Sequence, residues 1–155
     1  MKAITIALTL ALCAFAIAVS FAAENPNMGT WQLNEAKSKI PAGVGKNTTV
    51  VYSAAGSDIK VNTDGVDGKG NAVHSEWTGQ FDGKPSPVTG TSVVDSRSVT
   101  DKGERTLEIA NMKDGSTVST GKVELAKDGK SRTLDTDGTL PDGKKYHAKY
   151  VYDKQ

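Results

Sequence analysis

The pair Asp-Gly occurs seven times in this chain, and it constrains the fold more than any other feature of the sequence. The pairs begin at Asp64, Asp67, Asp82, Asp114, Asp128, Asp137 and Asp142. A type I′ turn needs positive φ at both central residues, which Asp tolerates and Gly adopts freely. Four of the pairs continue into a lysine, which gives a polar exit from the turn. A chain with turns at this spacing is predicted to fold into antiparallel β-hairpins.

Short runs rich in Val, Thr, Tyr and Trp lie between these pairs, and apolar and polar side chains alternate along them as half-buried strands require. Val73, Trp77 and Phe81, for example, share one face of a predicted strand, whereas His74 and Glu76 share the other. The predicted strands cover residues 29–34, 47–54, 57–63, 71–81, 87–90, 92–100, 104–112, 116–126, 130–137 and 144–153.

Two local irregularities interrupt this pattern. One short helix is predicted over residues 35–39, because Pro41 disfavours helix in the residue before it. The alternation also changes phase near Gly121, from Val118 and Thr120 to Val123. A glycine bulge at Gly121 would absorb the extra residue.

About ten short strands joined by tight turns must protect their edges from pairing with other chains. A closed barrel does so completely, whereas a sandwich leaves edges to be protected. We therefore predict an all-β fold, a closed or nearly closed antiparallel meander barrel of about eight to ten strands. A barrel of this size can either fill its interior with side chains or hold a small ligand. Large apolar side chains are few for this number of strands, which favours a barrel that holds a ligand.

The first residues have the three parts of a secretory signal peptide. Lys2 is followed by an apolar run over residues 3–19, and Ser20 and Ala22 place small residues at the −3 and −1 positions of a cleavage site. We expect residues 1–22 to be removed as a signal peptide, which leaves a single domain over residues 23–155. The apolar run is short and lacks a basic flank, so no stable membrane anchor is expected. The predicted location is the periplasm or the extracellular space.

The charge and the cysteine content exclude several classes of function. The chain has 19 basic and 18 acidic residues, and they do not gather in blocks of like charge. A nucleic-acid partner or an anionic membrane surface needs a concentrated basic patch, so neither is expected. Cys13, the one cysteine, lies in the predicted signal peptide. The mature domain is therefore predicted to have no disulfide, zinc–thiolate site or cysteine nucleophile.

The segment Gly29-Thr30-Trp31 resembles the opening Gly-x-Trp signature of lipocalin-like barrels, in which the Trp closes the base of the barrel. Longer segments resemble a family of small uncharacterised secreted bacterial proteins. These segments are residues 29–34, 37–40, 74–78, 81–84, 87–90 and 152–155. The resemblance implies a lipocalin-like barrel with Gly29 and Trp31 at its base, export, and no assigned activity. The later Thr-Asp-Tyr signature of lipocalins is missing, and Arg105 and Arg132 are both candidates to stack on Trp31.

Catalytic and metal chemistry find little support in the sequence. His74, Glu76 and His147 could supply a His₂Glu metal set, but both histidines lie on the polar face and nothing pairs their strands. Ser75 lies in mid-strand without the Gly-x-Ser-x-Gly elbow of a hydrolase, and its neighbours point to the opposite face. We therefore predict no metal, no cofactor and no enzymatic activity.

The aromatic residues leave two interpretations open. They are either ordinary core, or some of them line a cavity and contact a small, mostly apolar molecule, with the tyrosine hydroxyls fixing its orientation. The candidate wall consists of Trp77, Phe81, Tyr146, Tyr150 and Tyr152. The first prediction is thus an exported, non-enzymatic binding protein for a small apolar ligand. The alternative is an envelope or extracellular protein-interaction module with a filled barrel, which would use loops such as 41–45 and 85–90. Neither interpretation fixes the oligomeric state.

Overall fold

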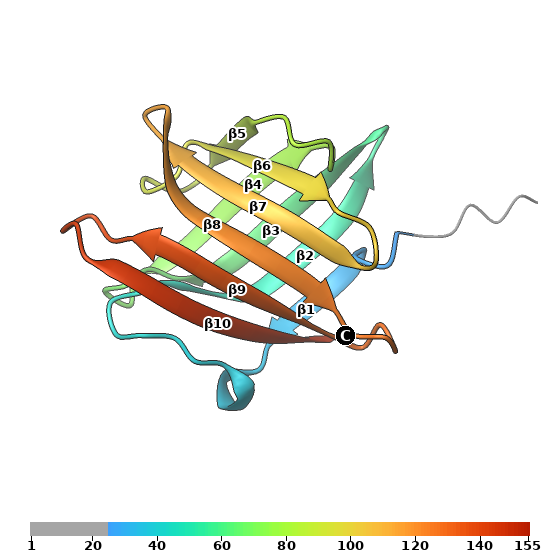
Figure 1. Cartoon of the computed structure of the whole chain (residues 1–155), viewed down its shortest axis with the longest axis horizontal. Coiled ribbons are helices and arrows are strands. Elements are labelled where there is room, and N and C mark those ends of the chain that lie inside the picture. Colours follow the sequence, from blue (N-terminus) through green and yellow to red (C-terminus); the bar gives the residue numbers. More distant parts are fainter. Residues whose placement is uncertain (1–24) are drawn as a thin grey trace, which may run out of the picture.

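The computed structural model describes residues 25–155, which form one closed antiparallel barrel (Figure 1). Its ten strands are β1 (Gly29–Leu33), β2 (Lys46–Ala55), β3 (Asp58–Val66), β4 (Ala72–Gly79), β5 (Ser86–Thr89), β6 (Ser96–Asp101), β7 (Thr106–Lys113), β8 (Ser116–Leu125), β9 (Ser131–Thr139) and β10 (Lys145–Lys154). Each strand pairs with the next, and β1 also pairs with β10, so the sheet closes on itself. The predicted meander barrel is confirmed, while the predicted signal peptide, residues 1–22, lies outside the described residues.

The two ends of the barrel differ in what they carry. Both ends of the described chain and the turns β2–β3, β4–β5, β6–β7 and β8–β9 lie at one end, which we call the termini end (Figure 1). The connections β1–β2, β3–β4, β5–β6, β7–β8 and β9–β10 lie at the opposite end, the loop end. This division follows from an up-and-down meander, in which successive turns alternate between the two ends.

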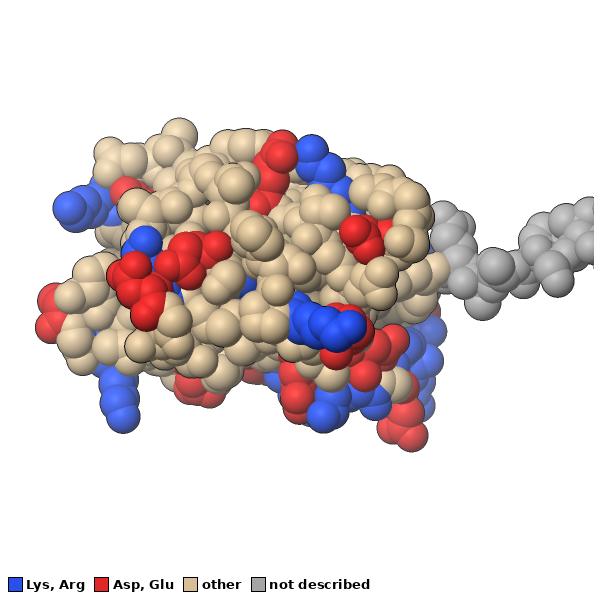
Figure 2. Space-filling view, turned by 90° about the horizontal axis from the view of Figure 1, so that it is seen from above, with Lys and Arg blue, Asp and Glu red and all other residues tan. Residues whose placement is uncertain are grey.

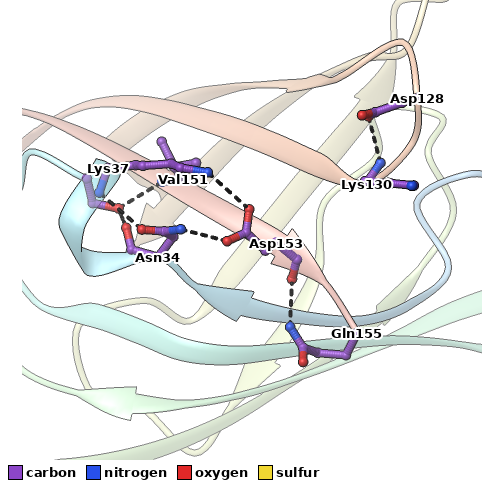
Figure 3. A network of polar contacts seen from close by, with 8 residues as sticks. Asn34, Lys37, Asp128, Lys130, Val151, Asp153 and Gln155 are labelled. Atoms are coloured by element: carbon purple, nitrogen blue, oxygen red, sulfur yellow. Dashed lines mark hydrogen bonds and ion pairs between the residues drawn. The ribbon is translucent and has the colours of Figure 1, made fainter.

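A short 3₁₀ helix, η1 (Glu35–Lys37), begins the β1–β2 connection and is fastened to the last strand. Asn34 Nδ2 donates a hydrogen bond to Asp153 Oδ2 at 2.6 Å, and the backbone N–H of Val151 donates to Ser38 Oγ at 2.9 Å (Figure 3). These bonds hold the connection against β10. A helix was predicted at this place, and it is one turn long.

Five of the seven Asp-Gly pairs lie in turns, but only Asp114 has the positive φ that a type I′ turn requires, at 49°. In the other four turns the Asp carboxylate accepts a hydrogen bond from the backbone N–H two residues later, at 2.8–3.0 Å, as Asp128 does from Lys130 (Figure 3). This Asx-turn leaves the positive φ to a following glycine. The expectation of type I′ geometry is therefore wrong for these four pairs.

The remaining two pairs, at Asp64 and Asp137, lie inside β3 and β9, so the expectation of a turn there is wrong. In both places glycine is needed for close approach rather than for positive φ. A Cβ on Gly65 would collide with the backbone of β2, and one on Gly138 would lie 2.6 Å from the Tyr146 hydroxyl oxygen. The strands can approach closely only because these positions lack a side chain.

The hairpins β3–β4 and β9–β10 carry the same polar pair on their outer faces. Asp64 lies opposite His74 with 2.7 Å between Oδ1 and Nδ1, and Asp137 lies opposite His147 with 3.0 Å between the same atoms. In both hairpins the Asp begins an Asp-Gly pair within the strand. The two hairpins are thus built on one local pattern.

The predicted bulge in β8 exists but lies three residues earlier than expected. Val118 is the extra residue, because Ser119 and Thr117 pair with consecutive residues of β7. Gly121 pairs regularly with Ile109. The glycine therefore keeps the ladder intact and leaves empty space on the inner face of the barrel.

The outer surface carries both signs of charge in alternation. Lysine and arginine side chains lie beside aspartate and glutamate over the face shown in Figure 2. Within residues 25–155, each of the ten ion pairs joins an acidic side chain to a lysine or a histidine. None of the helices in this range has the length and hydropathy needed to cross a bilayer.

Candidate functional site

Trp31 closes the termini end of the barrel. Its side chain is fully buried, and Nε1 donates a hydrogen bond to the carbonyl of Asn27 at 2.8 Å. The Arg132 guanidinium lies over the Trp31 ring, 4.6 Å from its centroid. The same guanidinium lies 4.7 Å from the Tyr52 ring and 5.2 Å from the Tyr152 ring. A cation between three aromatic faces is stabilised by their quadrupoles, so this cluster forms a firm base.

The other base position, Gly29, begins β1 at a φ of 105°, a conformation that residues with a side chain rarely adopt. Of the two arginines considered as partners of Trp31, Arg105 lies exposed in the β6–β7 turn. Arg132 is the one that stacks on the ring.

Two residues of the predicted cavity wall, Trp77 and Phe81, belong to this packed region. Their rings stack with centroids 6.4 Å apart, and Phe81 meets Tyr52 edge-on at the same distance. Trp77 is 1% exposed, and its Nε1 donates a hydrogen bond to the carbonyl of Arg97 at 3.0 Å. Neither residue borders the interior cavity.

A cavity of about 160 Å³ lies inside the barrel, between this base and the loop end. Inward-facing residues of seven strands, β2, β3 and β6 to β10, line it. Space remains because several inward positions hold small residues, among them Ser119, Gly121 and Thr136. A Cβ on Gly121 would lie 2.8 Å from Leu134 Cδ1, which shows how directly that glycine maintains the cavity.

The other three predicted wall residues, Tyr146, Tyr150 and Tyr152, do line the cavity. Two of their hydroxyls already donate hydrogen bonds to backbone carbonyls. Tyr150 Oη donates to the carbonyl of Gly45 at 2.9 Å, and Tyr152 Oη donates to the carbonyl of Asn47 at 3.1 Å. Burial raises the pKa of both hydroxyls, so they remain protonated donors. These two tyrosines hold the start of β2 against β10 and contribute their rings to the wall.

Arg97 was not predicted as a site residue, yet its side chain borders the cavity. Its Nε donates to Asn111 Oδ1 at 2.7 Å, and Asn111 Nδ2 donates to Ser119 Oγ at 3.0 Å. Burial lowers the pKa of the Arg97 guanidinium, but arginine titrates so far above neutrality that it stays charged. The chain of bonds fixes the direction of this charge.

The cavity wall is therefore partly polar and carries two cations, which differs from the aromatic wall that we expected. Arg97 and Arg132 both line the cavity, and its lining includes no Asp or Glu. Strand alternation could have revealed both arginines. Arg97 is in phase with buried Val99, and Arg132 is in phase with Leu134, so both positions face inward.

A second hollow, of about 560 Å³, lies on the outer surface over β6 to β9. Its lining includes Glu108, Lys122, Asp135 and Asp137, which carry both signs of charge. This mixture indicates no particular ligand, so the interior cavity is the stronger candidate site.

The histidines do not form a metal site. Among residues 25–155, no three His, Cys, Asp or Glu side chains converge on a common point. His74 and Glu76 lie on β4 and His147 on β10, and these strands are not neighbours in the barrel. Each histidine is instead hydrogen-bonded to an aspartate on the adjacent strand.

No protein-family model matches this chain, and no curated protein matches it in sequence. Among solved structures, the chain is similar to a redesigned β-barrel, mFAP1, whose structure was determined with DFHBI bound. The similarity covers 83% of this chain and 95% of that chain, with 14% sequence identity and a TM-score of 0.44.

Proposed function

We propose that this chain is an exported, non-enzymatic binding protein that holds one small molecule inside the barrel. The observation that carries the proposal is the interior cavity itself. A closed barrel of this size can be filled by side chains, but here about 160 Å³ is left between a packed base and the loop end. A space of roughly 150 Å³ is enough to accommodate benzene, so the ligand is expected to be compact.

The surface gives less support to the alternative of a protein-interaction module with a filled barrel. Such a module would present a contiguous apolar patch. Among the described residues, Val93 is the one large hydrophobic side chain that is strongly exposed, at 55%. The loop 41–45 adds no large exposed hydrophobic side chain to it, and neither does the segment 85–90, which was expected to be a loop but contains strand β5.

Native mass spectrometry of the mature protein, purified from its host without detergent, tests the proposal. We expect a discrete adduct that disappears on denaturation. The matched control is Gly121→Leu, which fills the cavity from its wall and should lose the adduct. A clean mass for the wild-type protein, still clean after incubation with a host metabolite extract, would contradict ligand binding.

Export belongs to the same proposal and has its own test. N-terminal sequencing of protein recovered from the periplasm or the medium should begin at Ala23 if the predicted signal peptide is removed. Recovery of the full chain from the cytoplasm alone would contradict export. The resemblance to small secreted bacterial proteins with lipocalin-like barrels is part of this proposal, and the Trp31–Arg132 stack supports it.

A further inference from the structure

The chain contains only three arginines, and two of them point into the barrel. Every ion pair among the described residues uses lysine or histidine as the cation, so neither Arg97 nor Arg132 has a carboxylate partner there. Buried charges normally occur paired, because an uncompensated charge away from water is unfavourable. Arg132 is buried and Arg97 is half-buried, so two cations on one cavity without a carboxylate partner require an explanation.

Arg97 is held so that its terminal nitrogens remain available. Asn111 accepts the Nε hydrogen at 2.7 Å and is itself fixed by Ser119. Within the described residues, the Nη nitrogens of Arg97 have no hydrogen-bond partner. These two nitrogens form the edge of the guanidinium that binds a planar carboxylate in parallel hydrogen bonds.

Arg132, the second cation of the cavity, is buried among aromatic rings. Its side chain is 4% exposed, and its Nη1 is a buried donor without a hydrogen-bond partner. The rings of Trp31, Tyr52 and Tyr152 stabilise the cation through their faces but accept no strong hydrogen bond. Arg132 also lines the cavity, so its positive charge lies at the wall of the space that a ligand would occupy.

We propose that the ligand of this cavity is a compact organic acid whose anionic group is bound by Arg97, with Arg132 adding positive charge to the same cavity. This inference rests on the proposed function, since it names the class of molecule that the cavity holds. Both guanidiniums supply positive charge, and the Nη nitrogens of Arg97 supply the hydrogen-bond donors. The side chains of Ile109, Val123 and Leu134 line the same cavity and supply an apolar wall for the rest of the ligand.

The test compares acids with neutral molecules of the same shape on the wild-type protein. Isothermal titration with benzoate and hexanoate is set against benzamide and hexanamide. At least one acid is expected to bind about tenfold to a hundredfold more tightly than its amide, the range typical of a hydrogen bond to a charged group. Acid and amide binding equally well would overturn the inference and leave the proposed function standing.

Variants then assign the charge to the arginines. Arg97→Gln should weaken binding of the acid by about tenfold or more and leave binding of the amide unchanged. Arg105→Gln removes the same charge from an exposed turn and should leave both affinities unchanged. Equal losses in the two variants would overturn the role of Arg97. If Arg97→Gln does not fold, the acid–amide comparison on the wild-type protein still decides the inference.

The charge of the molecule released in the native mass spectrometry experiment tests the inference independently. An acid that ionises in negative mode supports the inference. A neutral adduct overturns it while the proposed function holds. No adduct, together with no binding of any acid or amide in the panel, overturns both.

Discussion

The interior of this barrel consists of two halves built on the same alternating strands. In the termini half the inward positions hold large side chains, among them Trp31, Trp77 and Leu107, which are 0–1% exposed. In the loop half the corresponding positions hold small or polar residues such as Thr63, Ser119 and Thr136. The backbone pattern is the same in both, so the difference lies entirely in the size and polarity of inward side chains.

This difference indicates that one set of inward side chains stabilises the fold, whereas another set leaves room for a ligand. Large apolar and aromatic side chains in close packing supply most of the stabilisation of a barrel. A cavity lined by polar groups contributes little to stability, because contacts are lost and buried charges are unfavourable. Changes at the packed residues of the termini half should therefore act mainly on folding, whereas changes at residues that line the cavity should act mainly on binding.

The largest effect is expected from Trp31→Ala in the termini half. Removing a fully buried aromatic side chain costs about 3–5 kcal/mol of unfolding free energy. The substitution also removes one of the rings under Arg132. Urea denaturation followed by circular dichroism measures the effect. A loss similar to that of a surface substitution would contradict the structural importance of this base.

Gly121→Leu is expected to have a moderate effect on stability and a complete effect on binding. The new Cβ lies 2.8 Å from the end of the flexible Leu134 side chain, which must move. Overpacking of this kind costs about 1–3 kcal/mol. Urea denaturation should show a folded barrel, and titration should show no ligand binding. Retained binding would place the ligand elsewhere.

A smaller effect is expected where a tyrosine hydroxyl holds the start of β2 against β10. Tyr150→Phe removes the hydrogen bond to the carbonyl of Gly45 and leaves the ring in the cavity wall. The expected loss is about 0.5–1.5 kcal/mol of unfolding free energy. Affinity for the ligand should change little, because the hydroxyl is used by the backbone. A large loss of affinity with unchanged stability would show that the hydroxyl contacts the ligand instead.

The smallest effect concerns the exposed His74–Asp64 pair on the outside of the loop half. The hydrogen bond that His74 Nδ1 donates to Asp64, with a further contribution from Glu76, raises the pKa of His74 above its ordinary value of 6.5. A group whose pKa rises on folding stabilises the protein below its unfolded pKa, and this stabilisation is lost as the pH rises through the folded pKa. The Tm difference between wild type and His74→Gln should therefore be larger at about pH 5.5 than at about pH 8.5. The same difference at both pH values would contradict this contribution.

The sequence predicted the strands well because their signals are local. Alternation and turn residues located all ten strands, and the need to protect edges predicted a closed sheet. The turn geometry was harder to predict. Asp64 and Asp137 begin the same dipeptide as the turns, but the following glycine is there because another chain segment comes close. That reason depends on a neighbour in space, which one sequence does not show.

The candidate site was only partly predictable for a similar reason. Tyr146, Tyr150 and Tyr152 were placed inward by alternation and do line the cavity, whereas Trp77 and Phe81 are inward but lie in the packed half. The level of an inward residue along the barrel axis depends on strand tilt and register, which alternation alone does not give. Arg132 was predicted as a candidate partner of Trp31 but not as a cavity residue, and Arg97 was missed because basic residues are usually assigned to the surface.

The seam between β1 and β10 has a consequence for how the barrel forms. Nine of its ten strand pairings join consecutive strands, which can form as local hairpins. The pairing of β1 with β10 brings together residues as far apart as Trp31 and Lys154, 123 positions along the chain. Such a contact is the most demanding in chain entropy, and only three residue pairs form its ladder. The seam is therefore expected to close last during folding and to open first on heating.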